Sequence, residues 1–216
     1  MQYASGDHGE QHTGVFQPSM PFPLDNGDKI LFRPAIAYTA NDLDYSDSSG
    51  FSDISFDLAY APTLGDGNLL AVGVFTQLPT GSNGFSEEQF AVGPEILLGK
   101  ITQNWAAGLF PNHLWGVSNN GPYEDINRTS MQLFLIGLLD NAWSVGTTPV
   151  MTYDWNTDQA KIPLNITVRK TVMLGNRPWQ FGLEGNYYIE KADKDPDFML
   201  SLNITPVVTN HLADIF

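Results

Sequence analysis

Few side chains in this sequence are placed to do catalytic chemistry, and His113 is the one histidine inside a patterned segment. The other histidines fall in expected tails, namely His8, His12 and His211. A histidine activates a hydroxyl nucleophile when the two lie within hydrogen-bond reach, so Ser118 and Ser130 are the serines to consider. Their spacing is not specific to any hydrolase. A lipid hydrolase is therefore only the third of the functions that we weigh.

The sequence contains no short motif of a nucleophile elbow, a zinc protease, a phosphate loop or a dinucleotide site. Cysteine is absent, which excludes disulfides and thiolate chemistry. The acids cluster in expected loops, at 42–47, 87–88, 124–125 and 193–197, without the spacing of a calcium-binding EF-hand loop. We interpret them as solubilising loops or, alternatively, as groups that divalent cations bridge to anionic lipid headgroups. We expect no enzyme activity, no cofactor and no metal site.

The formal net charge of −14 and the pI of about 4.3 indicate a chain that repels nucleic acid. Charged residues make up 16% and aromatic residues 12% of the sequence, whereas about 25% of a typical soluble domain is charged. No apolar run reaches the roughly 18 residues of a transmembrane helix, and residues 1–7 lack the basic start and apolar core of a signal peptide. This balance fits a β-barrel whose wall is half exposed to lipid.

Segment 161–172 shows the pattern from which the fold is predicted. Leu164, Ile166 and Val168 alternate with Asn165, Thr167 and Arg169, and successive side chains of a strand point to opposite faces. The segment therefore has one apolar and one polar face. The same alternation recurs in segments of about ten residues separated by turn residues, which is typical of a transmembrane β-barrel with lipid outside and a wet lumen inside.

Eleven strands can be recognised by this alternation, each bounded by Gly, Asn, Asp or Pro. The predicted strands lie near 13–23, 29–40, 51–62, 69–79, 88–99, 103–117, 127–139, 143–155, 161–173, 178–190 and 197–208. Short connections such as 25–28, 65–68 and 175–177 alternate with longer ones such as 41–50, 80–87 and 118–126. Short periplasmic turns and long outer loops give this rhythm in an all-β, antiparallel up-and-down barrel.

The strand count and the direction of the last strand predict one more strand at the start of the chain. Bacterial single-chain barrels have an even number of strands, so about twelve are expected. If 197–208 runs toward the periplasm, then 13–23 does so too, and it begins outside after the polar stretch 5–13. The first strand is therefore missing from this sequence or survives only as Met1–Ala4.

Side chains at alternate positions of a strand share one face, which we call the parity of the strand. A polar residue with apolar neighbours at ±1 is therefore predicted to face the lumen. The predicted lumen-lining residues are Arg33, Asp57, Glu95, Arg128, Gln132, Asp154, Asn165, Arg169, Glu184 and Asn203. Both signs of charge occur in this set, and we expect Arg33, Asp57, Glu95, Asp154, Arg169 and Glu184 to form ion pairs inside. Such pairs would either fill and stiffen the barrel or form a polar constriction that selects solutes.

Aromatic and proline residues add two observations. All five tryptophans lie near predicted strand ends, where aromatic belts meet a membrane interface in barrels. Prolines fall inside many of the predicted strands, among them those at 18, 34, 94, 111, 149, 163 and 206. Proline cannot donate to a ladder, so we expect these positions to mark bulges or strand boundaries.

Several short segments, taken in order, resemble motifs of one bacterial family. From the N-terminus they are Val15-Phe16-Gln17-Pro18 with Pro21-Phe22, Asn112-His113-Leu114-Trp115-Gly116-Val117, Thr152-Tyr153-Asp154-Trp155-Asn156, Ile162-Pro163-Leu164-Asn165-Ile166-Thr167-Val168, Leu183-Glu184-Gly185-Asn186-Tyr187-Tyr188 and Asp195-Pro196-Asp197-Phe198. The set spans about 13 to 208. It resembles the outer-membrane transporter family that is linked by name to phenol degradation through the MetA pathway and sometimes labelled neuromedin U.

This resemblance implies an outer-membrane barrel of a Gram-negative bacterium with a link to uptake of hydrophobic or aromatic compounds. Members carry one more strand before the Gln17-Pro18 segment, which agrees with the strand count. Two departures are the absence of that strand and the extension at 210–216. The terminal Phe216 resembles the aromatic C-terminus that barrel-insertion machinery reads.

The sequence thus predicts a single domain, 1–216, that forms an outer-membrane channel or transporter for small solutes, hydrophobic or aromatic ones included. The alternative is a structural or interaction barrel whose plugged lumen transports nothing. The expected partners are membrane lipid and lipopolysaccharide, the insertion machinery through the C-terminal strand, and the solute itself.

Overall fold

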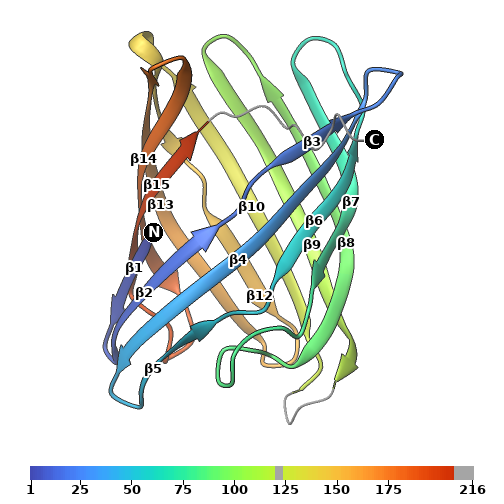
Figure 1. The fold of residues 1–216 in the computed structure, drawn as a ribbon. Coiled ribbons are helices and arrows are strands. Elements are labelled where there is room, and N and C mark those ends of the chain that lie inside the picture. Colours follow the sequence, from blue (N-terminus) through green and yellow to red (C-terminus); the bar gives the residue numbers. More distant parts are fainter. Residues whose placement is uncertain (120–123, 207–216) are drawn as a thin grey trace.

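Alternating apolar and polar side chains form strands along almost the whole chain. The computed structural model describes residues 1–119 and 124–206, and its strands form one antiparallel sheet that β9 and β10 close into a barrel (Figure 1). The strands are β1 (Gln2–Gly6), β2 (Gly9–Phe16), β3 (Met20–Pro23), β4 (Lys29–Leu43), β5 (Ser46–Phe51), β6 (Ser55–Ala61), β7 (Asn68–Gln77), β8 (Gln89–Ile101), β9 (Trp105–Asn119), β10 (Asn127–Leu138), β11 (Trp143–Thr147), β12 (Val150–Asp154), β13 (Gln159–Leu174), β14 (Arg177–Glu190) and β15 (Phe198–Pro206).

The wall has twelve strands, as the sequence predicts. β2 and β3 both pair with β4 and form one interrupted wall strand. β11 and β12 both lie between β10 and β13 and form another. β5 pairs only with the end of β4, so it extends a hairpin beyond the wall. The described residues contain one helical element, the three-residue 3₁₀ turn Asp140–Ala142. They contain no helix that is long and apolar enough to cross a membrane.

The first wall strand is present, which corrects the expectation that it is missing and agrees with the alternative that it survives near Met1–Ala4. β1 pairs with β15 through Gln2 and Ser201, and with β2 through Gln2 and Thr13. Much of the polar stretch 5–13, expected to lie outside the wall, is the β1–β2 turn and the first half of β2. Gly9 has a φ of 123°, which only glycine adopts readily, so it permits this tight turn.

Prolines explain where the predicted strands were too long. Predicted strand 13–23 is interrupted around Pro18, and predicted strand 143–155 is interrupted at Thr148 and Pro149, because proline removes a ladder donor. Pro163 lies beside a register shift between β13 and β14. Conversely, the predicted loop 41–50 was too long, because most of it forms a hairpin of β4 and β5. The last two positions of predicted strand 197–208, the extension 210–216 and His211 lie outside the described residues.

The connections alternate between short and long, as predicted. We call the end with β5 and the loops 78–88 and 191–197 the long-loop end; it is at the bottom of Figure 1. The opposite, short-turn end is tied together by Asp28, whose carboxylate accepts hydrogen bonds from the Tyr60 hydroxyl and, at 2.8 Å, from the backbone N–H of Thr63. These donors lower the pKa of Asp28 below its usual value. The turn β3–β4 is thereby joined to the turn β6–β7.

Candidate functional site

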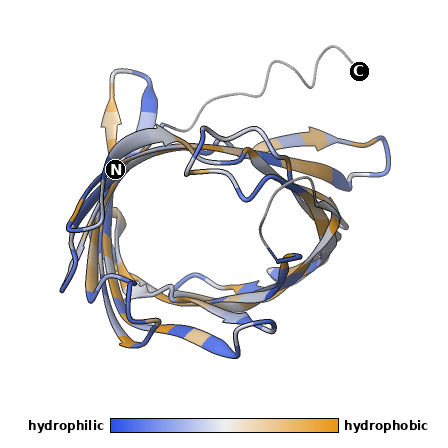
Figure 2. Cartoon of the chain, turned by 90° about the horizontal axis from the view of Figure 1, so that it is seen from below, coloured by the Kyte–Doolittle hydropathy of each residue, from blue (hydrophilic) through white to orange (hydrophobic). Residues whose placement is uncertain are grey.

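One contact between distant strands identifies the inner side of the wall. The Arg33 guanidinium carbon on β4 lies 5.2 Å from the ring centre of Phe110 on β9. Three strands, β6, β7 and β8, separate β4 from β9 in the sheet. Side chains that bridge them must therefore lie on the concave side of the ring seen in Figure 2. Arg33 and the residues that share its face line the interior.

Paired residues of neighbouring strands point to the same side of the sheet, so the register identifies the inner face around the whole barrel. Arg33 pairs with Asp57, Gly73 with Glu95, and Glu95 with Asn112. The ladders β9–β10, β10–β12, β12–β13, β13–β14 and β14–β15 continue the same parity. On the inner face lie all ten predicted residues: Arg33, Asp57, Glu95, Arg128, Gln132, Asp154, Asn165, Arg169, Glu184 and Asn203.

The outer face is apolar and exposed. Ile166 and Leu183 retain 61% and 65% of their accessible surface. Other exposed residues of this face are Leu58, Val72, Val74, Leu98, Leu133, Leu135, Leu164, Val168, Leu200, Leu202 and Ile204. Four of the five tryptophans are exposed as well: Trp105, Trp115, Trp143 and Trp155. A water-soluble monomer rarely exposes so continuous an apolar surface.

The first polar cluster of the interior lies on β4, β6 and β8. The Arg33 Nε atom donates to Asp57 Oδ2 at 2.6 Å. Glu95 is only 3% exposed, and neither of its carboxylate oxygens has a hydrogen-bond partner within the described residues. Arg33 thus bonds one carboxylate while its guanidinium reaches across to Phe110. This cluster lines one side of the lumen.

The second polar cluster lies on β13 and β14 and is centred on Asn165. Its Nδ2 donates to Glu184 Oε1 at 3.0 Å and to Asn186 Oδ1 at 2.7 Å. Its Oδ1 accepts from the backbone N–H of Thr148 at 2.6 Å. Asn186 Nδ2 also donates to Glu184 Oε1, at 3.2 Å. Two amides therefore donate to the Glu184 Oε1 atom, in the place where a cation was expected.

The expected internal ion pairs are mostly not formed, which corrects that prediction. Within the described residues, only Arg33 and Asp57 of the six form one, while Glu95, Asp154, Arg169 and Glu184 have no oppositely charged partner within 4.0 Å. Closer partners take several of these groups instead. Glu184 accepts hydrogen bonds from the amides of Asn165 and Asn186. Asp154 accepts the backbone N–H groups of Asn156 and Thr157, while its ladder partner Arg128 pairs with Glu87.

At the long-loop end, the interior is completed by loop residues. The alternation of side chains along a strand does not predict where these residues point. Arg128 pairs with Glu87 at 3.2 Å, and Gln77 Nε2 donates to the same carboxylate at 2.6 Å. Asp53 accepts the backbone N–H groups of Thr80 and Gly81 at 3.0 and 2.8 Å. Its other oxygen accepts the backbone N–H of Glu87 at 2.9 Å. Asp53 thus holds loop 78–88 over the lumen rim, a role with no sequence pattern to reveal it.

His113 lies on the outer face, where it bonds neither of the serines considered for catalysis. Its Nδ1 is 2.7 Å from Thr129 Oγ1, which also accepts the Trp155 Nε1–H at 2.8 Å. Ser130 is the ladder partner of Asn112 and faces inward. No carboxylate is bonded to the His113 ring within the described residues, so the orienting group of a catalytic triad is not found there. The arrangement is a hydrogen-bond cluster on the outer face of the barrel.

We expect Thr129→Val to loosen this cluster. The substitution keeps the shape but leaves the Trp155 indole N–H and the His113 ring unpaired, which should lower the free energy of unfolding by about 1 kcal/mol. Urea titration in lipid vesicles measures the loss. The neighbouring Ser130→Ala should change the unfolding free energy by less than about 0.5 kcal/mol. Equal effects of the two substitutions would contradict the assigned role of Thr129.

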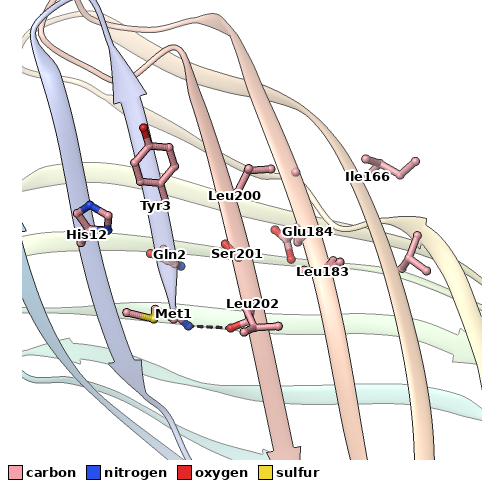
Figure 3. Close-up of a pocket in the computed structure, with 12 residues that line it drawn as sticks. Met1, Gln2, Tyr3, His12, Ile166, Leu183, Glu184, Leu200, Ser201 and Leu202 are labelled. Carbon is pink, nitrogen blue, oxygen red and sulfur yellow. Dashed lines mark hydrogen bonds between the residues drawn. The ribbon is translucent and has the colours of Figure 1, made fainter.

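A hollow of about 540 Å³ lies on the wall where β1 meets β15 (Figure 3). It forms over Gly185, whose missing side chain leaves a space between the outward-facing Ile166, Leu183 and Leu200. Tyr3 closes its other side. The lining is almost wholly apolar, so the hollow belongs to the outer apolar face and not to the interior. No group of three or more metal-ligating side chains occurs among the described residues.

Comparison with known proteins gives the fold. No family model and no curated protein matches the sequence. Among solved structures, the barrel is similar to an outer membrane channel from Pseudomonas putida F1, with a TM-score of 0.73 at 16% sequence identity. The match covers 95% of this chain and 92% of that one. The two chains thus share a barrel over nearly their whole length.

Proposed function

We propose that this protein is an outer-membrane channel that lets small solutes pass. The observation that carries the proposal is the register, which gathers the charged and amide side chains inside and leaves the apolar ones outside. Lipid can cover only such an outer face, and only a closed barrel leaves no edge unpaired in a bilayer. The similar barrel from Pseudomonas putida is itself described as an outer membrane channel, which supports both the location and the class of function.

The polar interior favours passage over a purely structural role. Asn165, Glu184 and Asn186 form a hydrogen-bonded surface on one side, and the Arg33–Asp57 pair lies on the other. A solute in transit can exchange hydrogen bonds with such groups at little cost, because amide, carboxylate and guanidinium groups can also bond water. Hydrophobic or aromatic solutes remain candidates through the family resemblance, and lipopolysaccharide and insertion machinery remain expected partners.

The second candidate is a plugged barrel without transport. Phe75 packs against the buried Ala91, Leu114 and Ile126, so part of the interior is filled with apolar side chains. The Arg33–Phe110 contact narrows the same region. Twelve strands enclose a lumen that folded-in side chains can block. A conductance measurement separates the two candidates.

Planar-bilayer recording of the refolded protein tests the proposal. We expect discrete conductance steps in KCl, together with a band shift between unboiled and boiled samples on a gel that reports the folded barrel. Liposome swelling with small neutral solutes extends the test beyond ions. A barrel that shows the band shift but neither conducts nor admits any solute would instead be the plugged form.

A further inference from the structure

A cavity of about 370 Å³ lies at the long-loop end, inside the mouth of the barrel. Four connections meet there: the β1–β2 turn, the β4–β5 turn, and the loops 78–88 and 191–197. The side chains of Ala4, Gln11 and Asn41 form its wall on the inner face, since they share the parity of Gln2 and Ser201. Its volume is at the lower end of the range for small-molecule sites.

The carboxylates that approach this cavity already have partners. Asp195, which lines it, accepts the Lys161 ammonium at 3.0 Å. Asp44, next to the lining residue Tyr45, pairs with His8 Nδ1 at 3.1 Å. A cationic ligand would have to displace one of these groups. The cavity therefore offers no free anionic anchor.

Lys194 is the cation of this cavity that stays available. Its ammonium lies 5.2 Å from the ring centre of Tyr45 and has no carboxylate within 4.0 Å among the described residues. By contrast, Lys161 and Lys191 on the same rim are each paired with an aspartate. A protein with a net charge of −14 thus presents an unpaired ammonium in its mouth.

The groups around Lys194 define the kind of anion. Tyr45, Leu43 and Pro196 provide apolar surface, while Gln11 and Asn41 provide amides that bond each other at 2.8 Å and can also donate. One ammonium suits a singly charged carboxylate, whereas a phosphate is usually held by several cations or a bidentate guanidinium. The apolar surface suits a ligand with a small hydrophobic body.

We propose that this cavity binds small organic carboxylates, with the carboxylate on Lys194 and the hydrophobic body against Tyr45. This inference rests on the proposed channel function, because the cavity would hold these solutes at the mouth before they pass through the lumen. The cavity indicates a class of solute that the lumen residues alone do not indicate.

Titration of benzoate into the folded barrel in detergent micelles, followed by ligand-observed NMR, tests the site. Benzoate carries one carboxylate and an aromatic body, and benzamide is its neutral counterpart. Lys194→Gln removes the charge but keeps much of the stem. Lys170→Gln is the matched control, because the Lys170 ammonium also lies over an aromatic ring, 5.1 Å from the centre of Trp143, but near the short-turn end.

We expect benzoate to bind the unchanged protein and the Lys170→Gln variant alike. Lys194→Gln should weaken binding about tenfold, as expected when a charge-assisted hydrogen bond is lost, and benzamide should bind the unchanged protein as weakly. Equal benzoate binding by both variants, or no binding at all, would overturn the site. Conductance is recorded on the same preparations. Conduction without benzoate binding would contradict only this inference. Benzoate binding without conduction would contradict the channel function and still support the carboxylate site.

Discussion

Arg33→Ala is expected to raise the single-channel conductance. The Arg33 side chain leaves β4, bonds Asp57 on the next wall strand and reaches Phe110 on β9, so it extends over the lumen side of three intervening strands. Alanine removes that obstruction. The substitution also leaves the nearly buried Asp57 carboxylate unpaired, which should cost about 1–3 kcal/mol of unfolding free energy. Conductance should therefore rise while stability falls.

The two readouts separate an open lumen from a plugged one. Arg177→Ala is the control, because Arg177 is exposed at the start of β14 and forms no ion pair among the described residues. It should alter neither conductance nor unfolding. If Arg33→Ala destabilises the barrel but leaves conductance unchanged, then another part of the interior limits passage. The apolar cluster of Phe75, Leu114 and Ile126 would then be the next set of side chains to shorten by substitution.

Much of the wall could be predicted because a period of two is a local property of the chain. The alternation of Leu164, Asn165 and Ile166 gives the face of each side chain before any partner strand is known. The parity of one strand also constrains its neighbours through the ladder. This is why Asp57 and Glu95, predicted separately, lie on the same face as Arg33 in the structure.

The strand breaks could not be predicted from proline alone. Pro18 and Pro149 interrupt wall strands, yet Pro34, Pro94 and Pro111 lie within β4, β8 and β9. The difference lies in whether the missing N–H would have been bonded to a neighbour, and that depends on the register of the partner strand. A single sequence contains the proline but not the register.

The bonding partners inside the barrel were the least predictable feature. Glu87 meets Arg128 from a position 41 residues away in the sequence, and Asp53 holds the loop that carries Glu87. Loops have no period, so parity says nothing of where their side chains point. The general expectation of ion pairs failed for Glu184 for a related reason, since the nearest donors on its ladder are the amides of Asn165 and Asn186.

Arginine substituted on the two faces of β10 should have opposite consequences. Leu133 is an exposed apolar residue of the outer face, and its neighbour Gln132 faces inward, paired with Phe110 in the ladder. Leu133→Arg places a guanidinium against lipid near the middle of the strand. That should cost about 2–4 kcal/mol at the bilayer midplane. Gln132→Arg places the same group in the wet interior, where its cost should be below about 1 kcal/mol.

The pair tests the membrane location and the register together, because the two variants differ by one position in the same strand. Urea unfolding in lipid vesicles gives both free energies, and the gel band shift gives the folded fraction. A larger loss for Gln132→Arg would mean that the faces are reversed. Equal and small losses would mean that lipid does not cover the outer wall. Both results bear on the proposed channel, because a polar solute path requires the charged and amide side chains of the wall to face inward.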